Sequence, residues 1–171
     1  MKEYVNSVGK YFIGILGGLF VAMLLILAGS FLSRFFFEKG SGVEIILYVL
    51  LMAAGLFGNL FAVSFGLGYK NADFRWKSTL VSVLIAACLQ VLVCVPFSFS
   101  IYVAGPAYPL AELLYRMING SSSPYGTPDL YVFLCMLVFV PLYVATAMAG
   151  ERLGAKKRRK DREKLVSGKN Q

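Results

Sequence analysis

Few side chains of this chain could do chemistry, and their spacing matches no catalytic pattern. The sequence has no histidine, which removes the commonest general base and the commonest metal ligand. The nine carboxylates lie in connections, in tails or at the edges of apolar runs, and no phosphate-binding loop or GxSxG motif occurs. The three cysteines lie inside apolar runs without a CxxC spacing, which indicates buried free thiols: Cys88, Cys94 and Cys135. The sequence therefore predicts a non-enzyme with no catalytic residue, metal site or cofactor.

Two amides stand deep inside apolar runs. Asn59 and Gln90 both need hydrogen-bond partners there, because lipid supplies none. The favoured interpretation is that they bond to each other or to a neighbouring backbone and fix the register of helices. The alternative is that, together with Tyr102 and helix-interrupting prolines, they line a path for a neutral or apolar substrate.

A dense basic block, "AKKRRKDREKL", follows the last apolar run. Its cations are Lys156, Lys157, Arg158, Arg159, Lys160, Arg162 and Lys164. A basic block at the edge of a span fixes topology and attracts anionic lipid headgroups, by about 1 kcal/mol per Lys or Arg. Because the block follows a membrane span so closely, nucleic acid is a less favoured ligand than lipid headgroups. Asp161 and Glu163 allow i,i+4 pairs, so the last helix is expected to continue into the block.

The composition places these residues in a membrane protein. The 171 residues are 58% hydrophobic and only 15% charged, whereas soluble domains are about 45–50% apolar and about 25% charged. Four apolar runs reach spanning length, and each must be a helix in lipid: residues 11–33, 43–67, 78–103 and 130–149.

The predicted fold is therefore an all-α integral membrane bundle of four transmembrane helices. Residues 1–149 form the transmembrane domain and residues 150–171 a basic cytoplasmic tail. The first run could instead be a cleaved signal peptide, but it exceeds the usual apolar core of about 7–15 residues. The short connections predict that helices consecutive in sequence are antiparallel neighbours.

Lysines and arginines are unevenly divided between the two sides of this topology. Fourteen of the 17 lie at the N-terminus, in the second connection and in the tail, whereas only Arg34, Lys39 and Arg116 lie on the other side. By the positive-inside rule, the protein is a multi-pass protein of the cell membrane with both termini in the cytoplasm.

The third connection carries an apolar pattern of its own. Five residues fall at i, i+3, i+4, i+7 and i+8: Leu110, Leu113, Leu114, Met117 and Ile118. Glu112 and Arg116 are placed to pair on the other face. The pattern predicts a short amphipathic helix on the outer membrane surface, with a plain apolar tether as the alternative.

Small residues recur at four-residue spacing, which lets membrane helices approach closely. The stripes are Gly14, Gly18 and Ala22 in the first span, Gly58, Ala62 and Gly66 in the second, and Ala145 and Ala149 in the fourth. We interpret them as contacts within the bundle, although contacts between copies fit the same pattern.

These features favour an accessory, assembly or regulatory subunit of a membrane complex. The expected partners are the lipid bilayer with its anionic headgroups, and either another protein or further copies of the chain. The alternative function is a small transporter or channel subunit for a neutral or apolar substrate.

Overall fold

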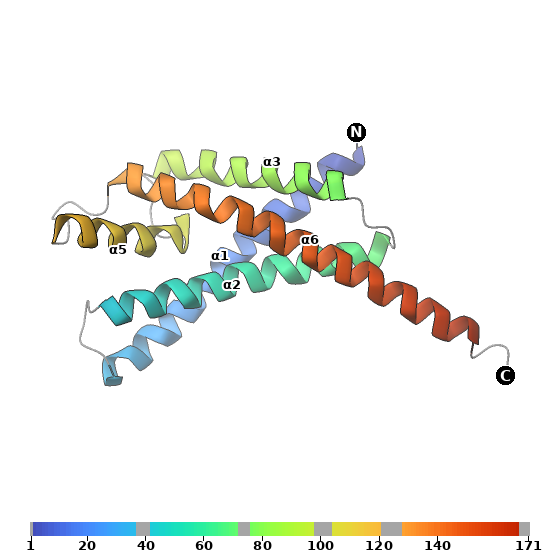
Figure 1. Cartoon of the computed structure of the whole chain (residues 1–171), viewed down its shortest axis with the longest axis horizontal. Helices are drawn as coiled ribbons and strands as arrows, with labels where there is room; N and C mark the ends of the chain where they lie inside the picture. The colour runs from blue at the N-terminus through green and yellow to red at the C-terminus, as the bar shows by residue number, and fades with distance from the viewer. Residues whose placement is uncertain (1, 37–41, 72–75, 98–103, 121–127, 168–171) are drawn as a thin grey trace.

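The computed structural model of the chain describes residues 2–36, 42–71, 76–97, 104–120 and 128–167, and these are almost entirely helical (Figure 1). Its elements are α1 (Lys2–Phe36), α2 (Gly42–Asn71), α3 (Trp76–Cys94), the 3₁₀ turn η1 (Val95–Phe97), α5 (Ala107–Asn119) and α6 (Asp129–Ser167). Four of the helices contain segments long and apolar enough to cross a membrane. The expectation of an all-helical chain with four possible spans is confirmed.

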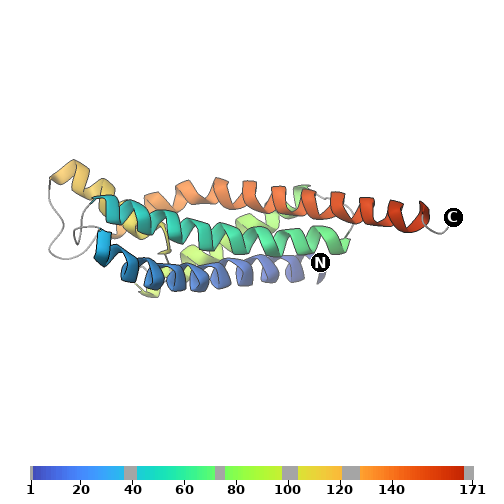
Figure 2. The same ribbon diagram turned by 90° about the horizontal axis from the view of Figure 1, so that it is seen from below.

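The four long helices pack as a ring. α2 lies against α1 and α6, and α3 lies against the same two helices (Figures 1 and 2). Within the described residues, α2 and α3 therefore stand across the bundle from each other without a substantial interface, although they follow each other in sequence. The expectation that all consecutive helices are neighbours is wrong at this step, because α1 and α6 fill the space between them.

The third span is shorter than the sequence indicates. α3 ends at Cys94, and the 3₁₀ turn η1 carries Pro96. Proline has no N–H to donate and restricts the residue before it, so it ends the helix here instead of only kinking it. The last part of the expected span, residues 98–103, lies outside the described residues. The 19 residues of α3 are about 28 Å long, still close to the thickness of a hydrocarbon core.

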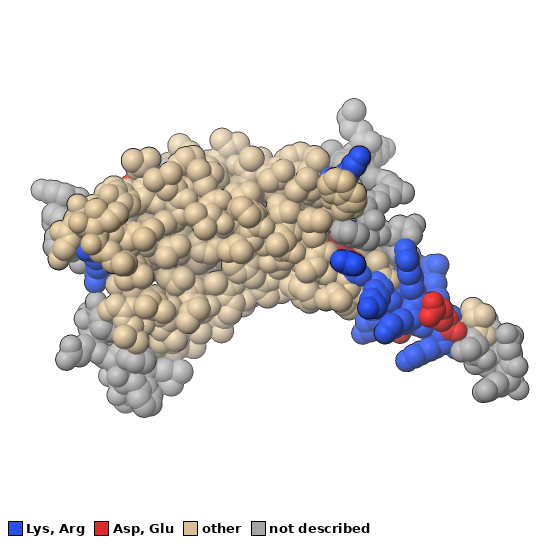
Figure 3. Space-filling view, in the orientation of Figure 1, with Lys and Arg blue, Asp and Glu red and all other residues tan. Residues whose placement is uncertain are grey.

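The last helix is much longer than a span. α6 runs for 39 residues, includes Pro141 and continues through the basic block, so it is about 58 Å long. The expected helical continuation of the fourth span is confirmed. Figure 2 shows this end of α6 projecting beyond the other helices, and Figure 3 shows Lys and Arg side chains gathered on it.

α5 packs against α6 and α2 through its small residues. Ala107, Pro109 and Ala111 are buried, whereas Leu114, Met117 and Ile118 are exposed. The large apolar side chains of the predicted amphipathic face therefore point mostly away from the bundle. Glu112 and Arg116 form the i,i+4 ion pair.

Candidate functional site

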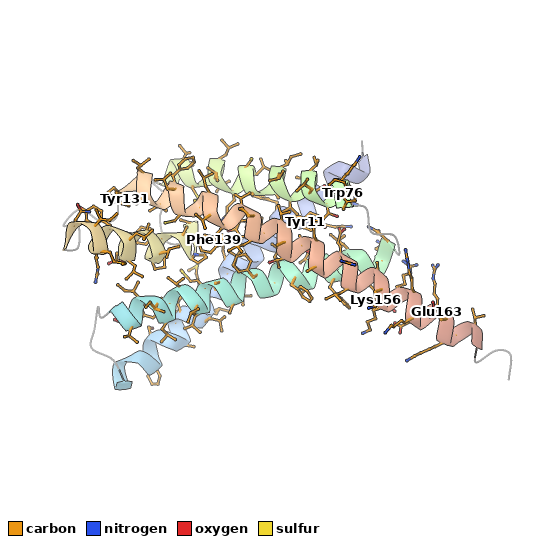
Figure 4. The ribbon with its side chains drawn as sticks, in the orientation of Figure 1. Tyr11, Trp76, Tyr131, Phe139, Lys156 and Glu163 are labelled. Carbon is orange, nitrogen blue, oxygen red and sulfur yellow. The ribbon has the colours of Figure 1, made fainter. Side chains whose placement is uncertain are left out.

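A buried polar cluster joins three helices near one end of the bundle. Glu151 of α6 is only 9% exposed. Its carboxylate accepts hydrogen bonds from the Tyr11 hydroxyl of α1 and from the Thr79 hydroxyl of α3. Tyr11 is fully buried and Thr79 nearly so (Figure 4 labels Tyr11). A buried carboxylate needs donors that satisfy both its oxygens, and these two hydroxyls supply one each.

The two amides predicted from the sequence both face neighbouring helices. Asn59 Nδ2 of α2 donates to Gly14 O of α1 over 2.7 Å. Gln90 of α3 lies within reach of the hydroxyl of Tyr143 on α6, and both side chains are buried. Asn59 and Gln90 are thus each engaged across a helix interface, in two different interfaces of the ring. The third predicted path residue, Tyr102, lies outside the described residues.

The small residues of α1 lie in its interface with α2. A Cβ on Gly18 would come within 2.9 Å of the Leu56 backbone, and one on Gly14 would meet Val63 at 3.4 Å. Ala22 is fully buried, and its backbone would lie 2.7 Å from a Cβ on Gly55. The close approach of these two helices thus depends on small residues from both.

The predicted stripes of α2 and α6 face outward. All five of their residues are exposed: Gly58, Ala62, Gly66, Ala145 and Ala149. No other part of the described chain would lie within 4 Å of a Cβ on Gly58 or Gly66. The interpretation of these stripes as contacts within the bundle is therefore corrected. The physical reason is the rotation of α2 and α6 about their own axes. Neighbouring residues point about 100° apart around a helix, so a small rotation turns a whole stripe from the bundle to the outside.

Other glycines form the close crossing of α2 and α6. A Cβ on Gly154 would overlap Phe65 O and lie 2.7 Å from Tyr69 N. A Cβ on Gly150 would lie 2.9 Å from Phe61 O, and one on Gly68 would overlap Glu151 O. The two backbones therefore touch at the same level as the Glu151 cluster. Gly150 and Gly154 form a GxxxG pair that sequence reasoning missed, although the spacing itself is the signal.

Beyond this crossing, one face of the α6 extension remains attached to α2. Arg158 Nη1 donates to Tyr69 O over 3.1 Å, and the Tyr69 hydroxyl donates to Asp161 over 3.2 Å. Lys157 Nζ stands 5.8 Å from the centre of the Phe65 ring. These contacts continue the line of Gly150 and Gly154 along the helix.

The remaining predicted headgroup residues lie on the other sides of the extension. All are exposed: Lys156, Arg159, Lys160, Arg162 and Lys164. Arg152, Lys156 and Arg159 share the face roughly opposite the α2 contacts, at i, i+4 and i+7. They line a hollow of about 460 Å³ together with Ala155. Sequence reasoning included Lys156 and Arg159 in the block but missed Arg152.

Comparison of the chain with protein-family models, with curated proteins and with solved structures finds no match. The function is therefore inferred from the geometry of the chain itself.

Proposed function

We propose that this protein is a non-enzymatic, multi-pass subunit that assembles with another protein in the cell membrane. The observation that carries the proposal is the outward stripe of α2. Gly58, Ala62 and Gly66 present a groove of small residues to the outside, where the described chain covers neither glycine. Because lipid tails are as apolar as leucine, such grooves are useful mainly where a second helix approaches closely.

The buried polar residues support an assembly role more than a transport role. Asn59 holds α1 against α2, Gln90 of α3 lies within reach of Tyr143 on α6, and Glu151 joins α6 to both α1 and α3. Polar groups engaged in this way stabilise a fixed helix arrangement, whereas a substrate path needs polar groups turned toward a channel. No contact in the described residues favours the transporter alternative over the subunit role.

We further propose that both chain termini are cytoplasmic. Three basic residues lie next to or near side chains that contact α6 at the end of the bundle with the basic extension: Lys10 beside Tyr11, Lys70 beside Tyr69 and Lys77 near Thr79. At the other end α5 would lie at the outer membrane surface, with Leu114, Met117 and Ile118 in the interface. The basic extension would then lie among the anionic headgroups of the cytoplasmic leaflet.

Site-specific photocrosslinking in native membranes tests the assembly role. A photoreactive residue at Ala62 should crosslink to another membrane protein. The Gly58→Leu/Gly66→Leu variant should lose that crosslink but keep the thermal stability of the isolated chain, because both side chains would point outward. The matched control is Ala28→Leu/Cys88→Leu, which adds bulk to exposed positions of α1 and α3.

Three results would contradict the proposal. The first is a crosslink only between copies of the chain, which would make the protein a homo-oligomer instead of a subunit. The second is an equal loss of crosslinking in both double variants, and the third is no protein crosslink at all.

A further inference from the structure

One buried hydroxyl of α3 has no hydrogen-bond partner in the part of the chain that the structure describes. Ser82 is fully buried, and its Oγ bonds to none of the described residues. Buried polar side chains are nearly always hydrogen-bonded, either to protein or to ordered water, because an unpaired one has given up its hydration for nothing. The packing of the described helices therefore leaves the Ser82 hydroxyl to be satisfied by something else.

A second fully buried serine shows the usual solution. Ser64 of α2 donates to Leu60 O of its own helix over 2.6 Å, which is the common behaviour of a serine inside a helix. The Ser82 hydroxyl does not make the equivalent bond within α3. It is therefore available to a group outside its own helix.

The Glu151 cluster lies one turn away from this hydroxyl. Ser82 and Thr79 are three residues apart on the buried face of α3, so their Cβ atoms are about 5–6 Å apart. Helical side chains lean toward the N-terminus of their helix, so the Ser82 side chain leans toward Thr79. A gap of about 5–6 Å is too long for one hydrogen bond and matches two consecutive bonds of about 2.8 Å through a single oxygen.

The chemistry of the cluster suits a water molecule in that gap. The Thr79 hydroxyl donates its proton to Glu151, and a hydroxyl oxygen that donates can still accept. Each carboxylate oxygen also accepts more than one hydrogen bond. A water that accepts from Ser82 would donate to Thr79 Oγ1 and to a Glu151 oxygen, which gives about the three bonds that are usual for a buried water.

We propose that one internal water molecule is bound between Ser82 Oγ and the Thr79–Glu151 pair. This water joins Ser82 to the cluster and gives α3 a second link to α6. The site is independent of the proposed assembly role, because it lies inside the bundle and not on its outer surface. A sodium ion is bound by the same kinds of oxygen, so the experiment must separate it from water.

The first test is the sign of one substitution, measured by reversible unfolding of the purified full chain. Ser82→Ala should raise the unfolding equilibrium constant by about three- to tenfold, because a water bridge contributes nearly as much as a direct interhelical bond. A hydroxyl that was truly unpaired would give the opposite sign, since alanine removes an unsatisfied polar group. An unchanged or lowered constant therefore overturns the proposal.

The second test asks whether Ser82 is coupled to the cluster. In a Thr79→Val background the effect of Ser82→Ala should shrink to less than about twofold, because the water has already lost its link to the cluster. The matched control is Ser64→Ala, whose hydroxyl bonds its own helix and whose effect should be the same in both backgrounds. An equal effect of Ser82→Ala in both backgrounds overturns the bridge, and so does an equal shrinkage for Ser64→Ala.

The third test identifies the bound species. The melting temperature of the full chain should be the same in sodium chloride and in choline chloride of equal concentration. A rise that requires sodium and disappears in Ser82→Ala would assign the site to a cation and overturn the water. A crystal structure grown without sodium should show a density peak within hydrogen-bond distance of Ser82 Oγ and Thr79 Oγ1. No peak there, in a map that shows other buried waters, also overturns the proposal.

Discussion

The Glu151 cluster makes the sharpest prediction about what holds the bundle together. Replacing Glu151 by alanine removes the acceptor of the Tyr11 and Thr79 hydroxyls and leaves both donors buried. Replacing it by glutamine keeps one acceptor oxygen and turns the other into an NH₂ group, which can only donate to a hydroxyl oxygen. The alanine variant thus loses two interhelical bonds, whereas the glutamine variant keeps one and exchanges the other for a neutral bond of reversed direction.

The magnitude follows from the number of bonds. Interhelical hydrogen bonds inside membranes contribute about 0.6 kcal/mol on average and up to about 1.7 kcal/mol. Glu151→Ala should therefore lower the free energy of unfolding by roughly 1–3.5 kcal/mol, and Glu151→Gln by at most about half as much. Glu163→Ala serves as the control, because this exposed carboxylate of the same helix should change stability by at most about 0.5 kcal/mol.

Reversible unfolding in mixed micelles, driven by a denaturing detergent, measures these differences. A double-mutant cycle between Tyr11→Phe and Glu151→Ala should give a coupling of about 0.6–1.7 kcal/mol. The reasoning is refuted if Tyr11→Phe costs the same in the presence and in the absence of Glu151. It is also refuted if both Glu151 variants match the control.

Three further substitutions test the helix contacts by thermal unfolding of the purified chain. Asn59→Ala should cost about 0.6–1.7 kcal/mol through loss of the bond to Gly14 O, and an unchanged melting temperature would show that the bond contributes nothing. Gly154→Ala should cost about 1–3 kcal/mol because its methyl would overlap Phe65 O. In the control Gly66→Ala the new methyl contacts no described residue, so this variant should be neutral or slightly stabilising. Equal effects of the two substitutions would contradict the close crossing of α2 and α6. Gly105→Ala should cost at least about 1 kcal/mol, because Gly105 has φ +59° and a methyl there would also overlap Leu19; a neutral result would contradict that backbone conformation.

The existence of the helices could be predicted from the sequence, but their inward faces could not. Long apolar runs must be helical in a membrane, so the apolar parts of α1, α2 and α6 could be predicted, whereas the first nine residues of α1 lie before its apolar run and were not. In a soluble helix the polar side marks the surface. In α2 both the exposed Leu50 and the buried Leu60 are apolar, because one meets lipid and the other the bundle. Nothing in the pattern therefore distinguishes Gly66, which faces out, from Gly68, which packs against α6.

Glu151 was missed for a different reason. Glu151 lies between the last apolar run and the basic block. Its position in the sequence therefore suggests the first charged residue of a solvent-exposed tail. Its partners are 140 and 72 residues away along the chain and are hydroxyls, not cations, so no charge pattern in the sequence points to them. The glycines on either side of it were the available signal. Gly150 and Gly154 bring the α6 backbone against α2, and a helix held that closely cannot turn the intervening carboxylate toward water without breaking the crossing. The Gly150–Gly154 pair therefore predicts the close crossing of α2 and α6, but it does not tell which of the two charges between the glycines is buried, since Glu151 is buried and Arg152 is exposed.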